Sequence, residues 1–142
     1  MSVPPLEALV PLGTCATREL VVTPALTVQH AYPALPAVYA TPQMIFAMEM
    51  AAADAIAALL PPGWGSVGTR VEVRHLAATP VGMRVVARAR VVEVGPRHVR
   101  FACEAHDEQD IIGDGWHERA PVELARFVTG VARKAAAMEN SR

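Results

Sequence analysis

The chain has 142 residues, a length that one domain with one hydrophobic core accommodates. Thirteen Lys and Arg residues against fourteen Asp and Glu residues give a formal net charge of −1, which excludes the strongly basic field of a nucleic-acid or anionic-membrane binder. Hydrophobic residues make up 52% of the chain and aromatic residues 5%, which is typical of a folded domain built from small and branched side chains. We therefore expect a small-molecule ligand or a protein partner, with no nucleic acid and no membrane.

The cysteines and histidines predict no metal site. Cys15 and Cys103 lie 88 positions apart, which favours two reduced thiols over a disulfide framework. The five histidines form no HxH or HxxxH pair. Because no apolar run reaches the roughly 20 residues of a membrane span and no basic flank precedes the first apolar residues, we expect a cytoplasmic protein.

Residues 1–142 are expected to form a single domain that begins with an irregular surface arm, residues 1–16. A first strand is expected near residues 18–22. The several prolines of residues 23–42 exclude a regular helix or a central strand, so this segment is expected to be an ordered loop and a candidate lid. The Ala-rich tail, residues 128–142, predicts a short helix or a frayed segment.

The segment TPQMIFAMEMAAADAIAALL, residues 41–60, predicts one long helix. Thr41 is a good N-cap, and Pro42 suits the first helical position because its missing N–H would have no partner there. The helix is expected to end before the Pro-Pro-Gly sequence of residues 61–63.

Alternating side chains then predict four strands, at residues 67–76, 83–94, 97–107 and 111–124. In the first of them Val67, Thr69, Val71, Val73 and His75 are expected to share one inward face. We expect the four strands to form an antiparallel meander. Since the helix is apolar on nearly every side, the predicted fold is α+β, a curved antiparallel sheet wrapped around one central helix.

Glu49 breaks the apolar pattern of the predicted helix. It shares a narrow arc with Ile45 and Ile56, whereas Asp54 lies about half a turn away and is free to be solvated. An ionised carboxylate in apolar surroundings costs several kcal/mol unless it is paired. Glu49 therefore either lies at an oligomer interface beside a cation or serves as a general base or nucleophile.

Two further side chains are candidates to work with Glu49. His75 is either a hydrogen-bonded core histidine or an acid/base partner, since alternation places it in the layer between sheet and helix. Thr41 is either a simple N-cap or a hydroxyl at the helix mouth, where backbone N–H groups favour negative charge.

Gly68 and Arg119 also have two interpretations each. Gly68 lies among β-branched and charged residues, which fits a bulge or a close approach of ligand to backbone as well as a plain strand entry. Arg119 can pair with Glu49 or hold an anionic ligand, and the alternative is a solvated surface arginine. Trp116 either narrows a pocket or covers the sheet.

A long helix after a proline-rich loop, followed by HLAATPVGMRV and GDGWHERAPVELARF, resembles the hotdog-fold thioesterases and, within them, the fluoroacetyl-CoA thioesterase family. The similarity runs from about residue 22 to residue 127. The resemblance implies an acyl-CoA thioester hydrolase that works as a homodimer with active sites at the subunit interface. It implies no cofactor apart from the CoA of the substrate.

The resemblance also implies roles for particular residues. The family's catalytic threonine, glutamate and histidine match Thr41, Glu49 and His75, and its substrate-contacting glycine and arginine match Gly68 and Arg119. In the family the glutamate, aided by the threonine, attacks the thioester or activates water, and the histidine assists proton transfer.

The lid loop departs from the family member that selects fluoroacetyl-CoA. That member has aromatic lid residues, whereas HAYPALPAVYA offers Tyr32 and Leu35 as substrate contacts and contains no phenylalanine, so a small acyl group is implied and its identity stays open. Two alternative functions also stay open. One is a non-catalytic hotdog protein that binds acyl-CoA or a hydrophobic ligand, and the other is an enoyl-thioester hydratase or dehydratase.

Overall fold

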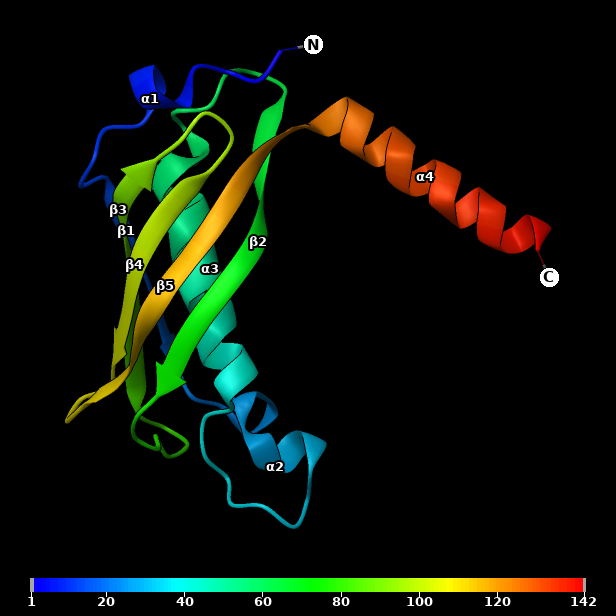
Figure 1. Cartoon of the computed structure of the whole chain (residues 1–142). Coiled ribbons are helices and arrows are strands. Elements are labelled where there is room, and N and C mark those ends of the chain that lie inside the picture. The colour runs from blue at the N-terminus through cyan, green and yellow to red at the C-terminus, as the bar shows by residue number, and fades with distance from the viewer. Residues whose placement is uncertain (1, 142) are drawn as a thin grey trace.

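The computed structural model describes residues 2–141, in which one curled antiparallel sheet embraces a long helix, α3 (Thr41–Ala57) (Figure 1). The five strands are β1 (Cys15–Val21), β2 (Trp64–His75), β3 (Arg84–Val94), β4 (Val99–His106) and β5 (Ile111–Glu123). The remaining elements are α1 (Leu6–Leu9), the 3-10 turn η1 (Pro24–Leu26), α2 (Val28–Ala31) and α4 (Leu124–Asn140). The expected curved sheet around one central helix is confirmed.

The strand order across the sheet is β1-β3-β4-β5-β2. The meander is therefore correct for β3, β4 and β5 but wrong for β2, which pairs with β5 while β1 pairs with β3. Alternation along a strand shows which side chains face the core, but it does not show which strand lies alongside. As a result β1 and β2 are the two edges of the sheet, and the 12-residue strand β2 has one edge without a partner among residues 2–141.

The helix α3 is fixed to the concave face of the sheet by a buried stripe of small and flexible apolar side chains. These are Met44, Ala47, Met48, Ala51, Ala52 and Ile56. The alanines allow close approach of helix and sheet, and the methionines fill the remaining gaps. The predicted helix end at residue 60 is three residues too late.

The strand β2 contains a bulge between Gly68 and Arg70. Before the bulge the predicted alternation is wrong, because Gly68 rather than Val67 faces the helix. After the bulge the prediction is correct, because Val73 and His75 face the helix. A bulge places two residues of one strand opposite one residue of its neighbour, which inverts the alternation.

Both ends of the chain differ from their predictions. The N-terminal segment is not a surface arm, because Leu6 of α1 and Val10 are buried in the core. The tail forms a 17-residue helix, α4, that projects from the body (Figure 1). Within residues 2–141 no helix combines the length and the apolar character needed to cross a membrane.

Candidate functional site

A pocket of about 440 Å³ lies beneath the lid segment, residues 23–42, at the end of the molecule where α3 begins and β2 ends. The residues that line it include Val28, Val38, Tyr39, Thr41, His75 and Ala77. Burial raises the pKa of Tyr39 to about 12, so its hydroxyl stays protonated and donates to the Gln43 carbonyl at 3.1 Å. Most of the side chains that line the pocket are apolar, and a few polar groups lie along its wall, as is usual for small-molecule sites.

Thr41 and His75 are in direct contact in this pocket. The Thr41 Oγ1 lies 2.7 Å from the His75 Nδ1. The prediction of Thr41 as N-cap is wrong, because Ala40 occupies that position and Thr41 is the first helical residue, with its hydroxyl turned to the histidine. The structure therefore joins a hydroxyl from the start of α3 to an imidazole from the end of β2.

The His75 imidazole is neutral at pH 7. Burial lowers its pKa below the ordinary value of 6.5, and the backbone of Ala77 offsets only part of this effect. Its Nε2 is buried and has no hydrogen-bond partner among residues 2–141. A buried nitrogen without a partner is costly in a finished core, so its place at a pocket points to a ligand or a second chain as the missing partner.

Glu49 lies at the border of the buried stripe of α3 rather than at its centre, and it faces β2. A Cβ added to Gly68 would lie 3.1 Å from the Glu49 Oε2 and 3.0 Å from the His117 Cε1. Gly68 therefore has no side chain where the carboxylate and the imidazole need the space. The bulge predicted as one explanation of Gly68 is present. The atoms that approach Gly68 closely are side-chain atoms of Glu49 and His117, and the close approach of a ligand stays a prediction.

Arg119 is held beside Glu49 by a network of hydrogen bonds. It donates from Nε to the Ser66 Oγ and from Nη2 to the Ser66 carbonyl, each at 2.8 Å, and from Nη1 to the His117 Nε2 at 3.1 Å. His117 donates from Nδ1 to the Arg70 carbonyl at 2.8 Å. Because the His117 Nε2 accepts, this histidine is neutral with its hydrogen on Nδ1.

The Arg119 guanidinium is only 5% exposed, so the alternative of a solvated surface arginine is wrong. Burial lowers the pKa of Arg119, and the negative charge of Glu49 opposes that effect. Burial also lowers the pKa of His117, which the Arg70 carbonyl partly offsets. Sequence reasoning assigned no role to Ser66 or His117, although the spacing of His117 and Arg119 on one face of a strand was a usable signal.

The structure separates the predicted Glu49–His75 pair within one chain. Thr41 and Glu49 are eight residues apart on α3, which is about 12 Å along the helix axis. No hydrogen bond links Glu49 to His75 in the described part of the chain. The site residues therefore form two groups, Thr41 with His75 at one end of β2 and Glu49 with Gly68 and Arg119 near the other end.

Trp116, for which the sequence left two interpretations, lies on the outer face of the sheet. Trp116 is stacked between the guanidinium groups of Arg70 and Arg100, at 4.6 and 3.5 Å from the ring centre. It therefore covers the sheet and does not narrow the pocket.

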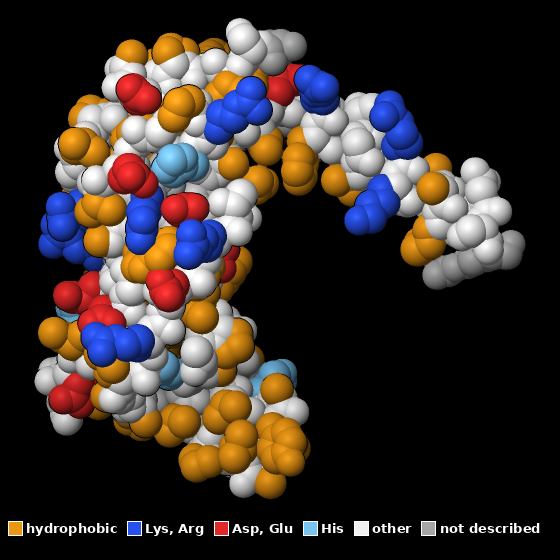
Figure 2. Space-filling model, in the orientation of Figure 1, with side chains coloured by type: hydrophobic (Ala, Val, Ile, Leu, Met, Phe, Trp, Pro, Cys, Tyr) orange, Lys and Arg blue, Asp and Glu red, His pale blue; other side chains and the backbone are white. Residues whose placement is uncertain are grey.

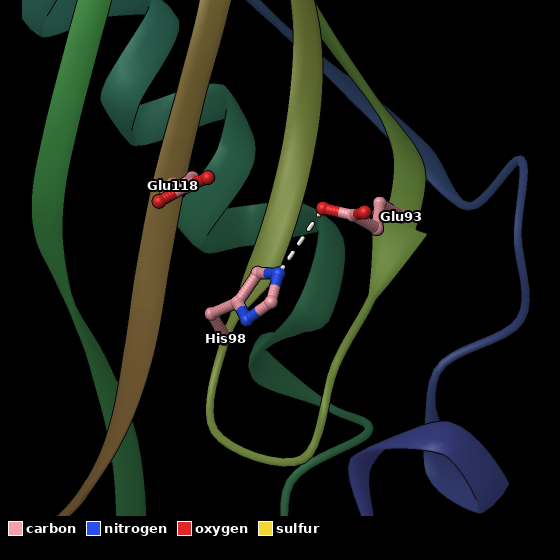
Figure 3. Close-up of side chains that lie close together, drawn as sticks. All are labelled: Glu93, His98 and Glu118. Atoms are coloured by element: carbon pink, nitrogen blue, oxygen red, sulfur yellow. Dashed lines mark hydrogen bonds and ion pairs between the residues drawn. The ribbon is translucent and has the colours of Figure 1, made fainter.

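Figure 3 shows Glu93, His98 and Glu118 on the outer face, where their ligand atoms lie within 4.8 Å of one another and the His98 Nε2 is 3.1 Å from the Glu93 Oε2. The sheet register places Arg100 between the two glutamates, where its charge offsets part of theirs. The absence of a metal site stays a prediction.

A curled antiparallel sheet around one helix, with a polar pair at the mouth of an apolar pocket, defines the class of hotdog-fold thioesterases. The chain belongs to the fluoroacetyl-CoA-specific thioesterase (FlK) family, whose sequence model matches residues 22–125. This confirms the resemblance found in the sequence.

Individual relatives agree with this family. The chain is 41% identical over 129 residues to the fluoroacetyl-CoA thioesterase of Streptantibioticus cattleyicolor, covering 87% of this chain and 93% of the relative. It superimposes on a structure of the fluoroacetyl-CoA thioesterase FlK with a TM-score of 0.82 and 41% identity, over 87% of this chain and 96% of that one. A hypothetical protein of Thermus thermophilus from the thioesterase superfamily gives a TM-score of 0.84 at 35% identity, over 94% of this chain and 98% of that one.

Proposed function

We propose that this thioesterase hydrolyses small acyl-CoA thioesters as a homodimer, with each active site combining Thr41 and His75 of one chain with Glu49 of the other. The observation that carries the proposal is the position of the two groups at opposite ends of β2, the strand with an open edge. Two copies of an edge strand can pair antiparallel across a twofold axis, which brings the beginning of one copy to the end of the other. The Glu49 group of one chain then meets the Thr41–His75 pair of its partner.

The chemistry of each group fits one step of the hydrolysis. Glu49 either attacks the thioester carbonyl or removes a proton from the attacking water, so that a new C–O bond forms and the C–S bond breaks. Backbone N–H groups at Gly68 or at the start of α3 stabilise the oxyanion. The His75 Nε2–H donates a hydrogen bond to the departing sulfur, and the proton released from water passes to the CoA thiolate. When Glu49 itself attacks, water then hydrolyses the acyl–Glu49 anhydride, which releases the carboxylic acid and restores the Glu49 carboxylate.

The His75 ring supports this assignment. When its Nδ1 accepts the Thr41 hydroxyl hydrogen, its Nε2 carries the ring hydrogen and has no partner within residues 2–141. A buried N–H is then free for the substrate, and the lowered pKa keeps the ring neutral before the reaction. The mechanism needs no cofactor apart from the CoA of the substrate.

A small acyl group is supported by the pocket and by the relatives. One fluoroacetyl-CoA-specific thioesterase structure holds fluoroacetate and CoA, and another holds acetyl-CoA. In the present chain, we assign Tyr32 and Leu35 of the lid segment to contact the substrate, since both are exposed on the segment whose Val28 and Val38 line the pocket. A cytoplasmic location is part of the proposal and is supported by the free thiols of Cys15 and Cys103.

Mixing two inactive variants tests the composite site. We expect Glu49→Gln and His75→Ala each to lower kcat/KM at least about a hundredfold, measured by release of free CoA thiol. Random pairing of the two variants then gives mixed dimers with one intact site each, and about a quarter of the wild-type activity returns. A mixture that stays inactive while mixed dimers form would show that both residues act within one chain. Wild-type turnover in both single variants would contradict the catalytic roles themselves.

A further inference from the structure

The helix α4 is apolar along one side. In its first turn Leu124 lies against Gly65, and Phe127 lines a pocket with Trp64, but beyond that turn the apolar side is exposed within residues 2–141. Its large apolar residues are between 44% and 63% exposed, and they are Leu124, Phe127, Val128, Val131 and Met138. Their spacing of three and four residues places them in one stripe along a helix about 25 Å long. Because an isolated helix of this length is marginal in water, the stripe requires a surface to pack on.

The start of α4 sets its direction relative to the open edge of β2. Glu123, the last residue of β5, pairs with Trp64, the first residue of β2, so α4 leaves the sheet at the beginning of β2. From there it extends past β2 and away from the rest of the sheet (Figure 1). Figure 2 shows a hollow between α4 and the opposite end of the molecule, where hydrophobic side chains gather at the lid.

A second copy fills this hollow when the open edges of β2 pair antiparallel. The beginning of β2 in one chain then lies beside the end of β2 in the other, next to His75 and the lid segment. That lid exposes Tyr32 at 61% and Leu35 at 42%, an apolar surface that matches the apolar stripe. The arm and the lid of one chain therefore face the lid and the arm of its partner.

We propose that α4 is an arm that packs its apolar stripe on the lid segment of a second copy, so that each pocket is covered by the partner's C-terminal helix. The proposal rests on the dimer of the proposed function and adds a device that controls entry to the same site. The family model ends at residue 125, so it does not describe most of the arm.

The two α4 helices would also enlarge the dimer interface. Stable dimers bury about 1,200–2,000 Å² in total, and one pair of strand edges is narrow. Two amphipathic helices, one from each chain, add apolar area on both sides of the strands. The opposite side of α4 carries Arg126 and Arg133, which stay in solvent in this arrangement.

Hydrogen exchange of the lid tests the arm. Val131→Asp places a charge in the stripe, and Thr129→Asp places the same charge on the opposite side of α4 as a matched control. We expect the amides of residues 28–40 to exchange about tenfold faster in Val131→Asp and at the wild-type rate in Thr129→Asp. Unchanged lid exchange in Val131→Asp, in a protein that sedimentation shows to be dimeric, overturns the proposal.

Mixed dimers test whether the arm acts on the partner. Nitrogen-15 labelling of the Val131→Asp chain separates its lid peptides by mass from those of the unlabelled wild-type chain. We expect the labelled lid to stay protected, because an intact arm covers it, and the wild-type lid to lose protection. The reverse pattern shows an arm folded onto its own chain and overturns the proposal.

Three other results separate this proposal from its alternatives. A monomer in sedimentation contradicts both the arm and the composite site. Binding of the wild-type chain to anionic vesicles through the stripe, with no change of lid exchange in Val131→Asp, assigns α4 to a lipid surface and overturns the proposal. None of these exchange measurements uses a thioester. If lid exchange changes as expected but the chain releases no CoA thiol, the result supports the arm and contradicts only the proposed activity.

Discussion

The two ends of β2 carry different kinds of chemistry. At the end near the lid, Thr41 and His75 form a neutral hydrogen-bonded pair beside a pocket. Near the other end, Glu49 faces a buried arginine that is held by Ser66 and His117. The first group offers a hydrogen-bond donor but carries no charge. The second carries charge: Arg119 is bound by Ser66 and His117, whereas the Glu49 side chain makes no hydrogen bond within residues 2–141.

This separation has a physical advantage. A carboxylate and an imidazole in contact in a buried site tend to share a proton and raise the pKa of the histidine. Thr41, the partner of His75, lies about 12 Å from Glu49 along α3, and no hydrogen bond links Glu49 to His75 within residues 2–141. Burial therefore favours the neutral form of His75, and Glu49 has Arg119 as its neighbour in each chain. In the proposed dimer the reactive combination exists only after the chains associate.

The largest expected effect comes from removing the charge at one end only. Glu49→Gln should lower kcat/KM at least about a hundredfold, because the group proposed to attack or to activate water is gone. The matched control is Asp54→Asn, an acid on the same helix that pairs with Arg18 on the surface and should change kcat/KM by less than about twofold. Equal losses in the two variants would remove the distinction between a functional and a structural carboxylate on α3.

A smaller effect is expected from filling the space beside Gly68, between β2 and the helix α3. Gly68→Ala places a methyl group against Glu49 and His117, so the carboxylate must shift, and we expect a loss of about tenfold in kcat/KM. In the control Gly65→Ala the new methyl group meets only the flexible Leu124 side chain, and activity should stay near wild type. Steady-state kinetics decides, and full activity of Gly68→Ala would place Glu49 outside the reaction.

The smallest effect is a dependence on pH. His75 and His117 have lowered pKa values in the folded chain, so below about pH 6.5 the unfolded chain takes up protons that the folded chain does not. The free energy of unfolding should therefore fall as the pH drops below 6.5 and be insensitive to these groups above it. In urea titrations His75→Gln should flatten this dependence, while the exposed His30→Gln should leave it unchanged. An unaltered curve for His75→Gln would contradict the burial effect on its ring.

The sequence predicted the helix α3 and the inward position of His75 well, because both depend on local patterns. Alternation placed His75 inward, and the Thr-Pro pair marked the start of α3. The partner of Thr41 was missed, since propensity describes a hydroxyl as a cap and does not show that a histidine 34 residues away comes within reach.

The rest of the site depends on tertiary structure that a single sequence does not specify. The bulge at Gly68 inverts the faces of β2, and the crossing of β2 to the far edge of the sheet places it beside β5. Both changes were needed to bring Gly68 to Arg119. The cluster of Glu93, His98 and Glu118 likewise comes from β3, the turn before β4, and β5, and leaves no spacing signal.

The open edge of β2 has a consequence for how the protein behaves on dilution. If two chains share one continuous sheet and each active site spans both, folding stability and turnover per chain depend on protein concentration. Below the dissociation constant of the dimer, a preparation loses activity and melting temperature together, and added inactive chains that still pair restore part of both. The fraction of complete active sites then depends on enzyme concentration, just as their occupancy depends on substrate concentration.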